Sequence, residues 1–496
     1  MRLTGNAPRS TPSHAPKCAR MNWKSSSPPP HSLDATSRQH HAAGETCSTL
    51  SMRPAAHLEI QQFIDQLPLS RYQLLVAILC AMVLFMDGFD AQAMGFVAPA
   101  LIDHLHFARA SLGPVFSSGL VGIMIGALVF GPLADRFGRK PILVFCTLLF
   151  GACSLLTATA GSLPSLLVYR LITGFGLGGA MPNAVALTSE FMPRRLRATA
   201  VTLMFVGFSI GAAVGGFVAA GLIARFGWQS VFITGGIVPC AIAVLLIALL
   251  PESIRFLLMK GGEDTKIAQS LARIAPGISP DLTLSPGVEE RPAREFVVKQ
   301  LFTAGRTPMT LLIWVIFFMS LLDLYFLNAW LPTVIHDAGI VIEKAIVLTA
   351  LFQVGGAVGS LIMGRVLDRF LSFRVLSCAY LAAGVLVFFI GAAGKSVTLL
   401  AVTIFAAGCG VIGGQSSANA LTAEFYPTPM RSTGVGWALG IGRVGSIIGP
   451  LLGGILLSFE HQTRRVFWAA AIPVLIASAA GFLASRTQSG TARESR

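Results

Sequence analysis

The chain has 496 residues, of which 54% are hydrophobic and 12% charged, with a formal net charge of +14 at pH 7. A soluble domain is about 25% charged, so this composition excludes an ordinary soluble protein and indicates a polytopic helical membrane protein. Lys and Arg gather in short segments between apolar runs, which is typical of membrane topology and not of nucleic-acid binding. The eight cysteines show no C-x-x-C spacing. No metal site, disulfide framework or cofactor is therefore expected.

The first 70 residues differ in composition from the rest of the chain: they contain Pro, Ser, His and Arg and no long apolar run. They lack the apolar core of a secretory signal peptide, so 1–70 is expected to be a disordered cytoplasmic tail. Met52 precedes a short lead-in to the first apolar run. We hypothesise that Met52 is the true start, which would make 1–51 a gene-model extension.

Twelve apolar segments follow, each long enough to cross about 30 Å of hydrocarbon, which takes about 20 helical residues. A polar stretch rich in Pro, Arg and Glu, 251–308, separates the sixth segment from the seventh. The sequence thus predicts an all-α polytopic membrane protein with one six-helix bundle in 71–250, a central cytoplasmic loop, a second bundle in 309–486 and a tail at 487–496. The predicted spans are 73–100, 112–132, 141–160, 163–186, 200–223, 230–250, 309–332, 345–367, 373–392, 396–418, 432–457 and 466–485.

Lys and Arg are concentrated in alternate loops and in the central stretch. Because basic residues are retained on the cytoplasmic side, both termini are predicted to be cytoplasmic, in the inner membrane of the cell. The two halves also repeat: GPLADRF at 131–137 returns as GRVLDRF at 364–370, and SEFMPRRLRAT at 189–199 returns as AEFYPTPMRST at 423–433. Two six-helix halves in parallel repeat are the arrangement of major facilitator transporters, which bind substrate near the midplane between the halves.

Charged residues at the predicted cytoplasmic helix ends can form salt bridges that close this side and break when it opens. The alternative is that they only determine topology. These gating candidates are Asp135, Arg136, Arg139, Lys140, Glu190 and Arg197 in the first half, and Asp368, Arg369, Glu424 and Arg431 in the second.

Two carboxylates, Asp87 and Asp90, lie inside the first apolar run. Ionised groups at bilayer depth cost at least about 2.5–3.5 kcal/mol each, so they are rare and usually functional. Their i, i+3 spacing places both on one helix face. We therefore predict a proton-coupling site, with Asp90 as the main group. The alternative is a helix cap or a fixed salt bridge.

Two arginines lie deep in predicted spans, where they need an acidic partner or an anionic ligand. Arg170 is at a depth compatible with a pair to Asp90, the alternative being a side chain that reaches to the outer interface. Arg443 lies near the midplane, and its planar guanidinium suits a substrate carboxylate. The alternative for Arg443 is a permanent ion pair with Asp323, which is otherwise a second proton-coupling candidate.

The loop Gly131-x-x-x-Asp135-Arg136-x-Gly138-Arg139-Lys140 resembles the signature loop of the major facilitator superfamily. Within that superfamily, the chain over about 55–485 resembles the aromatic acid:proton symporters. The resemblance implies uptake of a carboxylated aromatic, such as benzoate, a hydroxybenzoate or protocatechuate, with protons. It also implies importance for both Asp87 and Asp90. The similar stretches begin DGFDAQAMGF at 87, YRLITGFGLGG at 169, LDLYFLNAWLPT at 322 and AEFYPTPMRSTGVGW at 423.

Recognition of an aromatic acid requires ring contacts and polar partners beside the arginine. Phe89, Tyr325 and Trp437 are the aromatic candidates, and Asn328 is an amide that could bind a ring hydroxyl. The expected partners are thus a small aromatic carboxylate, protons and the lipid bilayer, and the chain is expected to act as a monomer without nucleic acid.

Three other functions stay open from the sequence. One is transport of another small organic anion. Another is drug export, although the G-x-x-x-G-P-x-x-G-G pattern of exporters falls at 445–454, in the eleventh span instead of the fifth. The last is a non-transporting aromatic-acid sensor, for which no output module is evident. An enzyme is not expected, because no nucleophile–base pair or metal cluster is present.

Overall fold

The structure is a computed structural model that describes residues 58–59, 64–65, 67–105, 107–260, 264–274, 284–285, 297–303, 305–370, 372–427, 430–459 and 463–494. The predicted disordered tail and the proposed start at Met52 fall almost wholly outside these residues.

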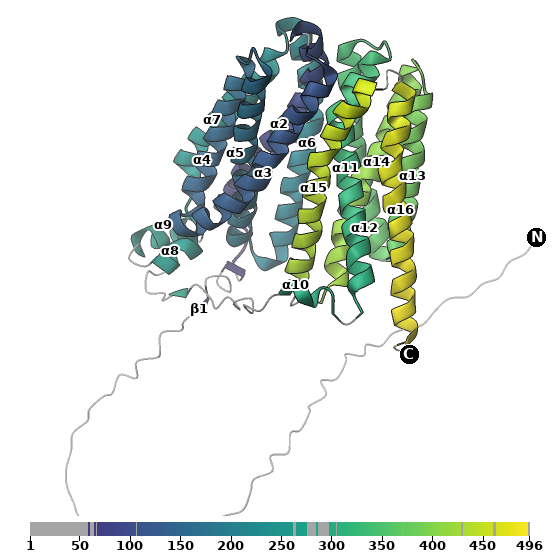
Figure 1. Cartoon of the computed structure of the whole chain (residues 1–496). Helices are drawn as coiled ribbons and strands as arrows, with labels where there is room; N and C mark the ends of the chain where they lie inside the picture. The colour runs from purple at the N-terminus through teal and green to yellow at the C-terminus, as the bar shows by residue number, and fades with distance from the viewer. Residues whose placement is uncertain are drawn as a thin grey trace, which may run out of the picture. The chain divides into compact units, whose positions relative to one another are not determined.

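Twelve helices in the described residues are long and apolar enough to cross a membrane, as the sequence predicts. They stand side by side in a bundle (Figure 1). Several extend beyond the apolar segment because helical structure continues into the polar interface. Their bounds are α2 Arg71–Leu105, α3 Arg109–Phe137, α4 Arg139–Ala158, α5 Leu163–Phe191, α6 Arg194–Phe226, α7 Gln229–Leu249, α11 Thr307–Asp337, α12 Ile342–Arg369, α13 Phe373–Ala392, α14 Val397–Phe425, α15 Arg431–Phe459 and α16 Thr463–Glu494.

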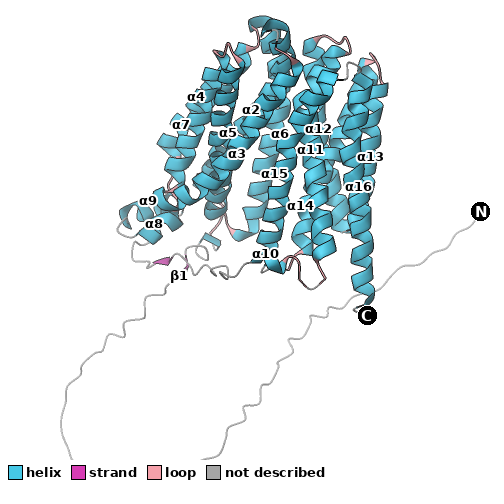
Figure 2. Cartoon of the chain, viewed as in Figure 1, coloured by secondary structure: helices cyan, strands magenta, loops and turns pink. Residues whose placement is uncertain are grey.

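The central stretch, predicted as a loop, contains short helices at α8 (Ile254–Lys260), α9 (Asp264–Ile274) and α10 (Val297–Gln300). A two-residue parallel pairing joins β1 (Leu58–Glu59) to β2 (Leu284–Ser285). Figure 2 shows α8 and α9 below the ends of α4 and α7. These helices are too short and too polar to resemble a membrane span, so the pattern of apolar runs does not predict them.

The helices pair in the same way in the two halves, as the sequence repeat predicts. In the first half α3 packs on α5, α2 on α6 and α4 on α7; in the second half the corresponding pairs are α12 with α14, α11 with α15 and α13 with α16. The halves meet along α3 with α15, α6 with α12 and α2 with α11. The fold is therefore an all-α major facilitator fold of two six-helix halves.

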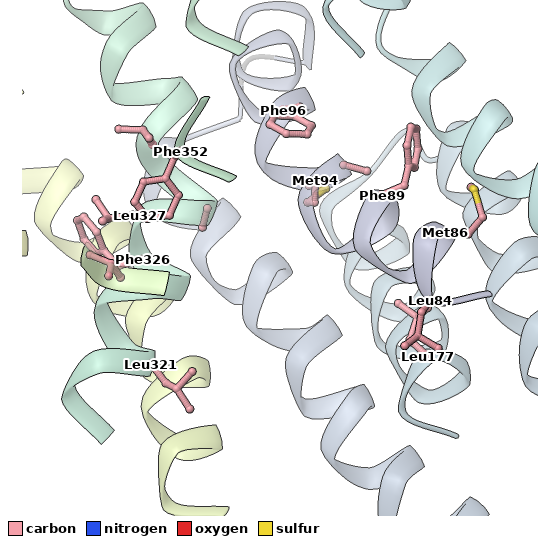
Figure 3. Close-up of a cluster of buried hydrophobic side chains, with 14 of the residues drawn as sticks. Leu84, Met86, Phe89, Met94, Phe96, Leu177, Leu321, Phe326, Leu327 and Phe352 are labelled. Atoms are coloured by element: carbon pink, nitrogen blue, oxygen red, sulfur yellow. The ribbon is translucent and has the colours of Figure 1, made fainter. Parts of the chain in front are cut away.

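Glycine allows close packing of these helices at two positions, Gly88 and Gly174. A Cβ added at Gly88 would overlap the backbone carbonyl of Phe208 on α6, and one added at Gly174 would overlap that of Gly119 on α3. Small residues permit such backbone approach in membrane bundles, where apolar side chains gain little from leaving lipid. Large side chains such as Phe96 and Phe352 fill the surrounding core (Figure 3).

Candidate functional site

A cavity of about 450 Å³ lies between the halves and is lined by residues of α2, α3, α5, α6, α11 and α15. Most of its wall is apolar, with Met94, Phe116, Met124 and Met181 among the contributors. Six residues that the sequence singles out line it together: Asp87, Asp90, Arg170, Tyr325, Asn328 and Arg443.

Asp90 and Arg170 form a buried ion pair at the cavity wall. Arg170 Nη1 donates to Asp90 Oδ1 at 3.0 Å, and Nη2 donates to Oδ2 at 2.8 Å. The guanidinium also lies 5.8 Å from the centre of the Phe232 ring. Arg170 thus turns inward to the acid, and does not reach to the interface as the alternative held.

Asp87 faces the same cavity from one turn earlier on α2, as the i, i+3 spacing predicts. It is buried and lies within electrostatic range of both Asp90 and Arg443. Within the described residues, its carboxyl group has neither a hydrogen bond nor an ion pair. It is therefore available to a proton or to a ligand.

Arg443 projects from α15 and is partly buried. Its Nη1 donates to the hydroxyl of Tyr325 at 3.2 Å, and no ion pair to it is found among the described residues. Within the described residues, the alternative pair with Asp323 does not form: Asp323 is 0% exposed, does not line the cavity, and neither of its carboxyl oxygens has a hydrogen-bond partner there. A guanidinium held only by a neutral hydroxyl can accept an anion.

The remaining substrate candidates differ in position. Asn328 lines the cavity and accepts a hydrogen bond from Gln353 Nε2 at 3.0 Å. Phe89 is buried against α6 and α7, because it lies on the face of α2 away from its acidic neighbours. Trp437 is 42% exposed and stacks on Trp314. Neither Phe89 nor Trp437 lines the cavity.

One end of the cavity is closed by contacts across the halves, and we call this the closed end. Arg109 Nη2 pairs with Asp337 Oδ1 at 2.8 Å, and His336 Nε2 lies 3.3 Å from Asp103 Oδ2. Deeper in, Trp330 Nε1 donates to the carbonyl of Pro450 at 2.9 Å. The two charged contacts join α2 and α3 of the first half to α11 of the second, whereas the Trp330 bond joins α11 to α15 within the second half.

The opposite end carries the gating candidates, and we call it the open end because Leu128, which lines the cavity near this end of α3, is 72% exposed. Arg139 Nε pairs with Glu190 Oε1 at 3.1 Å, as expected for a salt bridge between helix ends. Sequence reasoning missed Glu252, whose Oε1 accepts from the backbone N–H groups of Arg139 and Lys140 at 2.8 and 3.1 Å. An acid at the start of α4 is favourable because it satisfies free N–H groups and the helix dipole.

The other gating candidates form no ion pair within the described residues. Arg136 and Arg369 lie over the rings of the phenylalanines that follow them, at 5.4 and 5.6 Å. Arg431 Nε donates to the carbonyl of Tyr426 at 3.5 Å, and Arg197 Nε is buried without a hydrogen-bond partner. The acids without an ion pair are Asp135, Asp368 and Glu424, all exposed.

Two repeated six-helix halves with a partly polar cavity between them define a multi-pass membrane protein with the architecture of a secondary transporter. A family model described as Major Facilitator Superfamily matches residues 80–340 and 313–496. The chain belongs to the major facilitator superfamily, whose members are transporters and not enzymes.

Curated relatives are similar over nearly their whole length. The 4-hydroxybenzoate transporter PcaK of Acinetobacter baylyi is 44% identical over 431 residues, which cover 86% of this chain and 94% of the relative. The gallate transporter of Pseudomonas putida is 41% identical over 429 residues, covering 86% and 94%. A solved bacterial homologue of the human lysosomal transporter Spinster has a TM-score of 0.66 at 17% identity, covering 84% of this chain and 98% of that one, and shares the fold.

Proposed function

We propose that this chain imports a small aromatic carboxylate together with a proton, across the inner membrane, by alternating access. The asymmetry of Lys and Arg supports a cytoplasmic location for the open end and both termini. The closed end then faces outward, and the cavity opens toward the cytoplasm. The chain is proposed to work as a monomer, with its two bundles at 71–250 and 309–486.

The observation that carries the proposal is the position of Arg443 in one cavity with Asp87 and the Asp90–Arg170 pair. A guanidinium binds a carboxylate through two parallel N–H···O bonds. Among the described residues, the Arg443 guanidinium has only a neutral partner, the Tyr325 hydroxyl, so a substrate carboxylate would supply the missing negative charge.

The remaining cavity wall suits an aromatic ring. Its volume of about 450 Å³ lies within the roughly 300–1,000 Å³ of small-molecule pockets. Phe116, Met94 and Met124 offer apolar and thioether contacts, and sulfur at a ring edge is favourable. Asn328 is the polar group that could bind a ring hydroxyl. The relatives named as 4-hydroxybenzoate and gallate transporters support the same substrate class.

Coupling to a proton is proposed to occur at the acids of α2. Protonating Asp90 would remove the charge that holds Arg170, and Asp87 could take the proton first because it has no competing partner in the described residues. Because the ion pair joins α2 to α5 and the cavity touches both halves, protonation and substrate binding would act on the same helices. Asp323 is kept as a second coupling candidate.

The gating step is proposed to use the two ends in alternation. The Arg109–Asp337 contact would break as the outer side opens, and the Arg139–Glu190 pair would rearrange as the inner side closes. Switches of this kind depend on contacts formed in one state and lost in the other. The gating candidates without ion pairs would act only in the closed inner state.

Uptake into proteoliposomes tests this function. Labelled benzoate, 4-hydroxybenzoate, protocatechuate and gallate would be offered with and without an inward proton gradient, with 4-hydroxybenzamide as the uncharged control. We expect gradient-dependent accumulation of one or more of the acids and no uptake of the amide. Accumulation that does not depend on the proton gradient, or uptake of the amide as fast as that of the acid, would refute the proposal.

A further inference from the structure

A second cavity, of about 430 Å³, lies at the open end and is separate from the first. It is enclosed by the ends of α4 and α7, the short helices α8 and α9, and Tyr72 at the start of α2. Figure 1 shows α8 and α9 beneath α4 and α7. Residues of both short helices line the cavity. Among the described residues, three cations line it, Lys140, Lys260 and Arg273, with one acid, Glu252.

The acid in this cavity is already engaged. Glu252 Oε1 accepts from the backbone N–H groups of Arg139, Lys140 and Ser253 at 2.8, 3.1 and 2.9 Å. Its charge therefore serves the first turn of α4. Lys140 is also within electrostatic range of Glu252, but the described lining still carries more cations than acids.

Two of the cations are held by neutral groups. Lys140 Nζ donates to the carbonyl of Ile247 at 2.8 Å, and Arg273 Nη1 donates to the hydroxyl of Tyr72 at 3.4 Å, with its guanidinium 5.6 Å from the same ring. Lys140 and Arg273 come from different helices and are within electrostatic range of each other. Like charges that face one cavity repel, and an anion between them would remove the repulsion.

The upper wall of the cavity is apolar and continues onto the outside of the bundle. Leu249 and Leu250 at the end of α7, with Phe137 of α3, line this wall. Leu249 is 42% exposed and Phe137 56% exposed. Basic residues therefore lie below an exposed apolar rim at a helix end. This arrangement suits a phospholipid, whose phosphate would contact the basic residues and whose acyl chains would contact the apolar rim.

We propose that this cavity binds the headgroup phosphate of an anionic phospholipid, with Lys140 and Arg273 as the phosphate ligands and the α7 end against the acyl chains. A free phosphate could bind the same cations but has no apolar part to contact the apolar rim. The inference depends on the contacts of this cavity alone and stands apart from the substrate that the protein carries.

Native mass spectrometry of the full chain tests the site. The protein in neutral detergent would be mixed with phosphatidylglycerol, with phosphatidylcholine, and with inorganic phosphate. We expect phosphatidylglycerol to stay bound in preference to phosphatidylcholine. A double variant, Lys140→Gln with Arg273→Gln, should bind it about 30-fold more weakly, the factor expected for two cations at an anionic surface.

Two controls separate the site from general charge and from folding. Arg374→Gln removes an exposed cation at the same end outside the cavity and should leave lipid binding unchanged. Arg273→Gln alone changes no residue of a membrane span and loses one contact to a span, that to Tyr72, and it should still weaken binding. Equal binding of both lipids, or full binding by the double variant, would overturn the proposal. Displacement of the lipid by inorganic phosphate would overturn the lipid assignment and leave a phosphate site.

Discussion

Arg170 and Asp90 are joined by two hydrogen bonds, 3.0 and 2.8 Å long, between helices α5 and α2 at the wall of the central cavity. Both side chains are buried. Removing one partner of a buried pair leaves an unpaired charge and costs about 3–5 kcal/mol, whereas replacing both can be neutral. Single and double variants of the pair therefore separate its effect on protein stability from its effect on proton coupling.

The first prediction concerns Asp90→Asn. We expect it to abolish gradient-driven accumulation of the aromatic acid, because the amide cannot carry the proton. It should also lower the free energy of unfolding by about 3 kcal/mol, because Arg170 is left unpaired. Uptake in proteoliposomes and thermal unfolding of the purified protein measure the two effects.

The double variant Asp90→Asn with Arg170→Gln is the matched control for folding. It removes both charges, so the stability should return toward that of the unmodified protein while accumulation stays absent. Full accumulation by either variant at an imposed proton gradient would reject Asp90 as the coupling residue.

The second prediction concerns Arg443→Lys. The ammonium cannot donate two parallel hydrogen bonds to a carboxylate, so affinity for the aromatic acid should fall at least about tenfold. The stability should change little, because the Tyr325 hydroxyl is the only hydrogen-bond partner of the Arg443 side chain among the described residues. Isothermal titration measures the affinity, with Arg374→Lys as the control outside the cavity. Affinity equal to that of the unmodified protein would remove Arg443 as the carboxylate ligand.

The third prediction concerns Asp323→Asn. A buried carboxyl group with two unbonded oxygens is unfavourable, so its neutral counterpart should be at least as stable. Because Asp323 does not line the cavity, affinity for the aromatic acid should stay within about twofold. Because Asp323 is proposed as a second coupling site, the variant should lose gradient-driven accumulation and keep exchange of labelled for unlabelled substrate. A large loss of affinity would contradict the position of Asp323 outside the binding site.

The fourth prediction concerns the contact between α2 and α6. Gly88→Ala would force a methyl group into the carbonyl of Phe208, and overpacking of this kind costs about 1–3 kcal/mol. Gly131→Ala is the control, because nothing lies within 4 Å of the added carbon. Thermal unfolding should separate the two variants. Equal stability would show that α2 and α6 do not pack as closely as the structure has them.

Much of the fold was predictable because each membrane span carries its own signal. A run of about 20 apolar residues predicts a helix, and the repeated GPLADRF and GRVLDRF segments predict two similar halves. Costly charges in apolar surroundings marked Asp90, Arg170 and Arg443, and all three line the cavity.

The rest of the site was not predictable in the same way. An apolar residue such as Met124 looks alike whether it faces lipid or a cavity, so only the packed structure distinguishes the two. Rotation of about 100° per residue carries Phe89 and Trp437 away from the face of their charged neighbours. Glu252, a single acid in a polar linker, gains its role from the distant start of α4.

Substrate-driven proton movement tests the central claim most directly. Proteoliposomes with a trapped pH-sensitive dye and no imposed gradient would receive external 4-hydroxybenzoate. The account predicts luminal acidification faster than in protein-free liposomes, which correct for passive entry of the acid, and faster than with Asp90→Asn. Uptake of labelled substrate without that extra acidification, or with luminal alkalinisation, would contradict proton-coupled import.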